Sequence, residues 1–115
     1  MAKGRERIEA RRQSIAFLGK SLARRAARRC ELCDTNDSLR PYDLAPKEEP
    51  SLETLLLLCL RCQRLVDGET QDPRTLRFLE GTVWSEVEPI SSASKTVLRT
   101  VDAEWARDTL EMVEG

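Results

Sequence analysis

Cys30-Glu31-Leu32-Cys33 and Cys59-Leu60-Arg61-Cys62 are the two stretches that decide the fold of this 115-residue chain. Each has the form C-x-x-C, and 25 residues separate the first pair from the second. Two such turns brought together present four sulfurs in tetrahedral geometry, at about 2.3 Å from a zinc ion. With four sulfur ligands, no position remains for water or substrate. The spacing therefore predicts a closed, structural Zn²⁺ site on Cys30, Cys33, Cys59 and Cys62.

Two other arrangements of the cysteines are weaker interpretations of the same spacing. Two disulfides, or four buried free thiols, would also use all four side chains. Disulfides are disfavoured in a cytoplasmic chain, and a redox C-x-x-C motif is expected in a βαβ setting, which the sequence does not suggest. The metal site thus remains the favoured prediction.

The spacer between the cysteine pairs is long enough to hold structure of its own. Residues 39–44 are predicted to form one short strand, residues 46–50 a charged loop, and residues 54–58 a second strand. After Cys62 a short helix over residues 63–66 is expected to end at Asp67-Gly68. Turn, hairpin, turn and helix follow one another as in a treble-clef or HNH-like ββα zinc finger, so we expect that finger over residues 30–68.

Residues 1–29 are predicted to form a long basic helix. Ile8, Ile15, Leu18, Leu22 and Ala26 fall on one stripe of a helix with 3.6 residues per turn. On the opposite face the same periodicity aligns Lys20, Arg24 and Arg28 with Phe17. The segment has ten basic and two acidic side chains, a net charge of +8, whereas the remainder of the chain carries −9.

This charge asymmetry suggests a polyanion as partner. RNA or DNA is the favoured candidate, contacted by a basic set at the end of the helix: Lys20, Arg24, Arg25, Arg28 and Arg29. An acidic protein, or a second copy of the chain, is an alternative partner. The helix could instead be neutralised by the acidic body of its own chain, and the pI near 5.6 is low for a nucleic-acid-binding domain.

Residues 69–115 are predicted to be helical and to pack on the finger. Asp72-Pro73 is expected to begin a helix that Gly81 ends, and Pro89 to end an apolar edge. A further helix is expected around Val97, and a last one with Asp102 as its cap. Trp84 and Trp105 are interpreted as core anchors, because the chain has only five aromatic side chains. The predicted fold class is a small, mostly helical α+β domain with a four-cysteine zinc finger.

Composition limits the chemistry further. The chain has no histidine, which excludes every mechanism that uses imidazole as base, acid or metal ligand. The longest apolar run, residues 55–60, is too short to cross a membrane, and the N-terminus does not resemble a signal peptide. We therefore expect a cytoplasmic protein that is not an enzyme, with no small-molecule substrate evident.

After the cysteine pairs, the sequence continues with a run that contains Asp72-Pro73, Arg77, Leu79 and Trp84-Ser85-Glu86-Val87. With this run and the cysteine pairs, the chain from Cys30 to about residue 113 resembles the N-terminal domain of PhnA-like proteins, a bacterial family named for the alkylphosphonate utilisation operon. Thr75-Leu76 departs from the His-Trp pair of many relatives, and longer members continue into a small β-barrel. The resemblance implies a zinc-binding bacterial protein of poorly defined role, and does not imply cleavage of a C–P bond.

An enzyme remains the least favoured alternative, either as a degenerate HNH-type nuclease or as a participant in phosphonate metabolism. HNH nucleases carry metal-binding histidines where this chain has Tyr42-Asp43 and Gln63. The remaining acidic candidates have no motif that brings them together. They are Asp43, Glu48, Glu49 and Glu86.

Overall fold

The computed structural model describes the backbone of residues 2–115 and the side chains of residues 6–115. A long helix, α1 (Ala2–Arg25), is followed by a hairpin of β1 (Arg40–Asp43) and β2 (Leu55–Leu58). Then come α2 (Leu60–Val66), a 3₁₀ turn (Pro73–Thr75), α3 (Leu79–Thr82), α4 (Glu88–Leu98) and α5 (Glu104–Glu114). The predicted fold class, a small and mostly helical α+β domain with a long N-terminal helix and a four-cysteine cluster, is confirmed.

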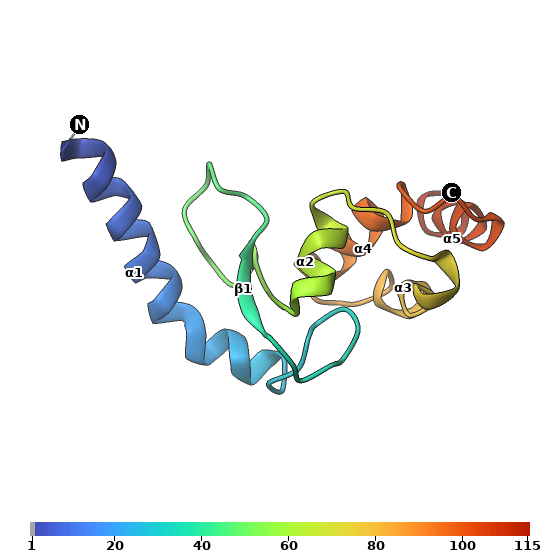
Figure 1. Cartoon of the computed structure of the whole chain (residues 1–115), viewed down its shortest axis with the longest axis horizontal. Helices are drawn as coiled ribbons and strands as arrows, with labels where there is room; N and C mark the ends of the chain where they lie inside the picture. The colour runs from blue at the N-terminus through green and yellow to red at the C-terminus, as the bar shows by residue number, and fades with distance from the viewer. Residues whose placement is uncertain (1) are drawn as a thin grey trace.

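The molecule is elongated, because α1 extends away from the hairpin while α2 to α5 gather on the hairpin's other side (Figure 1). Its radius of gyration is 15.0 Å, whereas a compact domain of this length has about 13 Å. The hairpin thus lies between α1 on one side and the group of α2 to α5 on the other. No helix in the part of the chain described here is long and apolar enough to cross a membrane.

The hairpin is antiparallel, with Arg40 paired to Leu58 and Asp43 to Leu55. Its strands lie within the predicted ranges of residues 39–44 and 54–58. All four leucines of β2 are buried, because both faces of the strand are covered. Successive side chains of a strand point to opposite faces, so Leu56 and Leu58 contact one layer and Leu55 and Leu57 the other.

The larger core lies between the hairpin, the cysteines and the C-terminal helices. It joins Leu56 and Leu58 to the buried side of α2 through Leu65, and to α4 through Val97 and Leu98. Trp105 of α5 packs against this core, and the guanidinium of Arg77 lies 5.0 Å from the centre of its ring. Trp105 therefore anchors the C-terminal helices, as predicted.

The smaller cluster lies between α1 and the hairpin. Leu22 of α1 is buried against Leu55 and Leu57, with Ile15 and Leu18 packed at its edge. These are residues of the predicted apolar stripe. Ile8 belongs to the same stripe but is 59% exposed, so the first half of α1 extends beyond the hairpin's apolar surface.

The end of α1 differs from the expected helix through residue 29. The helix ends at Arg25, and Ala27 and Arg28 adopt left-handed conformations, with φ of 53° and 58°. The Arg28 amide donates to the Ala23 carbonyl at 2.9 Å, which completes a helix-ending turn without glycine. This turn redirects the chain toward Cys30.

In the C-terminal half, Asp72, Gly81 and Pro89 occupy other positions relative to the helices than the sequence predicts. Asp72 caps only the 3₁₀ turn, because the amides of Thr75 and Leu76 bond three residues back, and Gly81 lies inside the separate α3. Pro89 occupies the first turn of α4, where its missing N–H costs nothing, so it begins a helix instead of ending an edge.

Two further predictions of this region were wrong. Ala103 precedes α5 as its cap residue, while the Asp102 carboxylate accepts a hydrogen bond from Arg107 at 3.1 Å. Trp84 is 57% exposed and is not a core anchor. Smaller side chains, among them Val83 and Leu79, form the core at that end.

Candidate metal centre and basic surface

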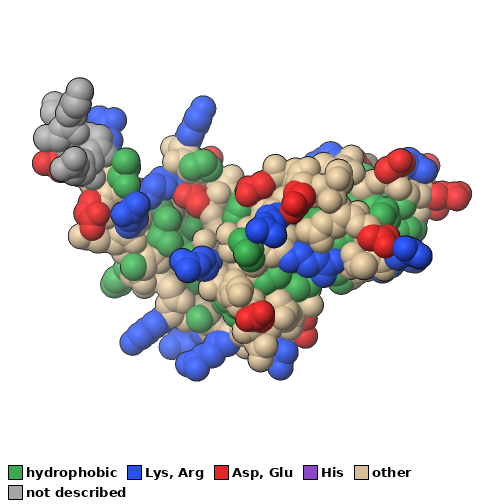
Figure 2. Space-filling model, viewed as in Figure 1, with side chains coloured by type: hydrophobic (Ala, Val, Ile, Leu, Met, Phe, Trp, Pro, Cys, Tyr) green, Lys and Arg blue, Asp and Glu red, His purple; other side chains and the backbone are tan. Residues whose placement is uncertain are grey.

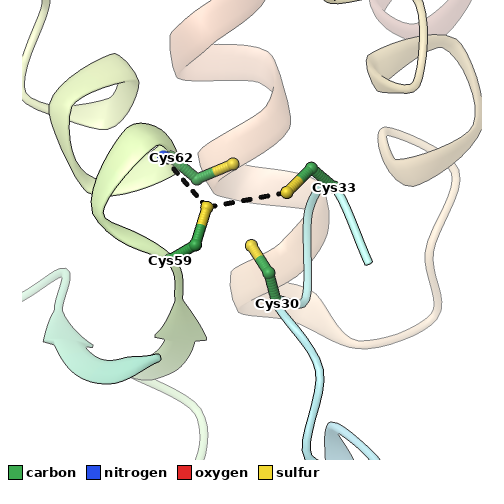
Figure 3. Close-up of side chains that lie close together, drawn as sticks. All are labelled: Cys30, Cys33, Cys59 and Cys62. Atoms are coloured by element: carbon green, nitrogen blue, oxygen red, sulfur yellow. Dashed lines mark hydrogen bonds between the residues drawn. The ribbon is translucent and has the colours of Figure 1, made fainter. Parts of the chain in front are cut away.

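The four cysteines converge from two segments that are far apart in the sequence (Figure 3). Their sulfur atoms all lie within 4.8 Å of one another, and the sulfurs of Cys33 and Cys59 are 3.6 Å apart. Sulfurs that surround a zinc ion tetrahedrally at 2.3 Å are about 3.8 Å apart. The spacing of these four sulfurs fits a single bound metal ion.

Local hydrogen bonds hold each cysteine pair in place. In the first, the Cys30 amide donates to the Thr35 carbonyl at 2.7 Å and the Asp34 amide to the Cys30 carbonyl at 3.0 Å. In the second, Cys59 is the N-cap of α2 and its sulfur accepts from the Cys62 amide at 3.5 Å. Because the cap begins the helix at Leu60, α2 starts three residues earlier than the sequence predicts.

The thiols form a closed and strongly interacting group. Cys30, Cys59 and Cys62 are buried and Cys33 is half-buried, with all four unoxidised. A hydrogen bond from Cys62 lowers the pKa of Cys30 to about 4, and the same hydrogen bond is the largest cause of a raised pKa at Cys62. Burial raises the pKa of Cys33 to about 11. The protons are therefore unequally shared, and a divalent cation would allow all four sulfurs to ionise.

These cysteines are the one group of three or more metal-ligating side chains within the part of the chain that the structure describes. The acidic nuclease candidates are not brought together in such a group. Asp43 is instead paired with Arg11, whose guanidinium nitrogen lies 2.6 Å from the carboxylate.

Comparison of the chain with protein-family models, with curated proteins and with solved structures gave no match. No family assignment follows, and the resemblance to PhnA-like proteins stays a prediction from the sequence. The findings support a four-cysteine module consistent with a bound metal, zinc being the metal that this donor set favours.

A basic surface lies at the C-terminal end of α1. Lys20, Arg24 and Arg28 are exposed and, with Ala23 and Ala27, line one open hollow of about 480 Å³. None of the three makes an ion pair with any side chain from residue 6 to residue 115. Figure 2 shows Lys and Arg side chains extending into solvent along the part of the surface that α1 forms. We call Lys20, Arg24 and Arg28 the basic surface.

Arg25 and Arg29, which the sequence placed with these residues, are positioned differently. The Arg25 guanidinium binds both carboxylate oxygens of Glu31 at 2.8 Å and the carbonyls of Leu52 and Leu55. Arg29 is exposed, but its guanidinium donates to the Asp34 carbonyl at 3.3 Å. Arg25 is therefore a structural residue of the α1–hairpin interface.

Sequence reasoning missed the ionic contacts of Arg11 and Arg25, although a signal was present. Arg11, Leu18 and Arg25 recur at intervals of seven, which places both arginines on the same stripe as Leu22. Arg11 donates two hydrogen bonds to Asp43 and one each to the Ala45 and Glu48 carbonyls. The stripe that faces the hairpin is thus apolar in its middle and cationic at both ends.

Glu31 was also missed. Its side chain, 2% exposed, receives the Arg25 guanidinium and also accepts the Leu57 amide at 2.8 Å, while its own amide donates to the Leu57 carbonyl at 2.9 Å. Together with the bond from Arg25 to the Leu55 carbonyl, these contacts occupy the edge of β2 that β1 does not cover. Glu31, which lies inside the first cysteine pair, therefore connects the cysteine cluster to α1.

Proposed function

We propose that this chain is a non-enzymatic, zinc-stabilised module that binds nucleic acid through the basic surface of α1. Zn²⁺ is the structural metal, held by Cys30, Cys33, Cys59 and Cys62. It would supply folding energy and no chemistry, because a four-sulfur site leaves no open coordination position.

One observation carries the proposal: five cations of α1 and of the turn that follows it fall into a neutralised set and an unpaired set. Arg11 and Arg25 face the hairpin and are neutralised by Asp43 and Glu31. Lys20, Arg24 and Arg28 face solvent around one hollow and are left without an acidic partner among the described residues. If the acidic body served only to neutralise the helix, the second set would be expected to be paired too. Unpaired, clustered cations favour phosphates as their partner.

The test is a fluorescence-anisotropy titration of the reduced, zinc-loaded protein with labelled oligonucleotides at several salt concentrations. About three phosphate contacts predict a slope of log affinity on log salt of roughly −2 to −3. The triple variant Lys20→Glu, Arg24→Glu, Arg28→Glu is expected to lose binding while keeping its zinc content and its circular dichroism.

The matched control is Arg12→Glu, Lys47→Glu, Arg64→Glu, which makes the same change in net charge at three exposed cations outside the basic surface. It should reduce affinity only through the general change of charge, far less than the first triple variant. Equal losses in the two variants would overturn the assignment of the surface. If the wild-type protein binds no oligonucleotide at low salt, the proposed function fails, and a defined complex in sedimentation would then favour a protein partner.

A further inference from the structure

Phe17 is the most exposed large apolar side chain of the described structure. It is 87% exposed, although Leu18, its neighbour in sequence, packs against the hairpin cluster. A large aromatic ring left in water on a helix that has an apolar face elsewhere contributes nothing to the core. The ring is therefore free to contact a partner.

The ring lies on the same side of α1 as the basic surface. Lys20 and Arg24 follow Phe17 at three and seven residues, so they occupy neighbouring turns of one helix face. At 1.5 Å per residue, their positions are displaced from that of Phe17 by about 4.5 and 10.5 Å along the helix axis. An aromatic ring and a row of cations thus form one continuous surface.

A groove beside Phe17 extends this surface toward the hairpin loop. It has a volume of about 470 Å³, and Gln13, Ser14, Glu49 and Pro50 line it together with Phe17. The Gln13 amide can donate to and accept from base edges, and the Ser14 hydroxyl, which donates to the Ala10 carbonyl at 3.0 Å, can accept from them. The groove therefore offers polar contacts next to the ring, at the end of the surface opposite Arg28.

We infer that the basic surface takes single-stranded nucleic acid, with Phe17 stacking on an unpaired base while Lys20, Arg24 and Arg28 contact the phosphates that follow it. The inference rests on the proposed function and narrows its ligand. A base in a duplex is stacked on both faces, so an exposed ring gains no face to contact, whereas every base of a single strand offers one. Contacts between cations and phosphates would not by themselves distinguish single-stranded from duplex nucleic acid.

The experiment compares three ligands of equal length: a mixed-sequence single strand, the corresponding duplex, and a strand of abasic sites that keeps the phosphates without the bases. The single strand is expected to bind most tightly. Phe17→Ala should weaken binding of the base-bearing strand by at least about fivefold, the effect of losing one stacked base. It should leave binding of the abasic strand unchanged, and Phe17→Tyr should restore the wild-type affinity.

Trp84→Ala is the matched control, because Trp84 is the other highly exposed aromatic side chain and lies outside α1. It should change none of the three affinities. Charge reversal of the basic surface should weaken all three, which reports on the proposed function separately.

Two results would overturn the inference and leave nucleic-acid binding intact. One is duplex binding as tight as single-strand binding. The other is a Phe17→Ala variant that binds the base-bearing strand normally, or that loses the same factor on the abasic strand. Loss of zinc or of helical circular dichroism is not expected in this variant, since the removed ring packs on no buried residue and alanine favours helix.

Discussion

The two faces of β2 are buried by different physical means. On one face, Leu56 and Leu58 join a cluster of fifteen buried residues that includes Cys30, Cys59 and Cys62. On the other face, Leu55 and Leu57 meet Leu22, the one fully buried side chain among those of α1 that the structure describes. The second contact is small for a helix of 24 residues, and the ion pairs of Arg11 and Arg25 lie at either end of it. The comparison indicates that the large core, which contains the cysteine cluster, holds the body, whereas charged hydrogen bonds hold α1.

Metal removal should have the largest effect, and should break the body before it affects α1 directly. Structural zinc contributes about 10–16 kcal/mol in small fingers, which matches or exceeds the whole stability of a typical domain. We expect a zinc chelator, or Cys62→Ser, to abolish the cooperative thermal transition and the near-UV circular dichroism of Trp105. A melting curve that is the same with and without chelator would show that the large core suffices alone.

Replacing one leucine of each cluster by alanine sharpens the comparison between the two faces of β2. Leu65 belongs to the large cluster and Leu22 to the small one, and both are at most 1% exposed. Each change to alanine should cost about 2–5 kcal/mol of local stability. Leu65→Ala should lower the global unfolding free energy, measured by urea titration. Leu22→Ala should instead raise hydrogen exchange in α1 while the large core keeps its protection. Equal protection losses in both regions would mean that the molecule unfolds as one unit.

Glu31→Gln tests the ionic part of the α1 contact. The change leaves the Arg25 guanidinium, whose side chain is 20% exposed, without its counter-charge. We expect a loss of about 2–4 kcal/mol, somewhat less than for a fully buried pair. Glu53→Gln is the matched control, because Glu53 is exposed and makes no ion pair with the described side chains. Hydrogen exchange of α1 is the measurement, and an unchanged pattern would assign the docking to the leucines alone.

The smallest effect concerns Tyr42, which packs on the large cluster and donates a hydrogen bond to Asp67. Burial, and then this bond, raises the pKa of Tyr42 to about 12. The folded state thus favours the neutral phenol, so its stabilising contribution is complete below the ordinary pKa near 10 and disappears as the pH rises toward 12. Because Tyr42 is the only tyrosine, absorbance of tyrosinate at high pH reports on it directly. A midpoint near 10 in the folded protein would contradict the prediction.

Much of the body could be predicted because its signals are local. The C-x-x-C spacing predicts which four cysteines come together, and Asp67-Gly68 ends α2 as expected, with Gly68 at φ 106°. Pro73 and Pro89 show the limit of such signals. Both follow an acidic residue and both begin a turn of helix, but only Pro89 is followed by enough buried side chains to continue it. A short helix depends on packing for its stability, which the sequence alone does not show.

Arg25 illustrates the same limit at the candidate binding surface. In the sequence it stands between Arg24 and Arg28 and looks equivalent to them. In the structure its side chain faces Glu31, while Arg24 faces solvent. One residue along a helix is a rotation of 100°, so neighbours face different surroundings, and only the position of the hairpin decides which of them is neutralised.

By itself, the sequence determined the grouping of the four cysteines, the hairpin between them, the helical character of both ends and the absence of imidazole chemistry. These follow from residue types at short spacings, where covalent geometry and hydrophobic periodicity act directly. Only the tertiary structure decided that Glu31 covers the edge of β2, that Trp84 stays in solvent, and which cations of α1 remain unpaired. Those outcomes depend on contacts between segments distant in the sequence, such as α1 with the hairpin, and the relative placement of such segments is set by packing of the whole chain.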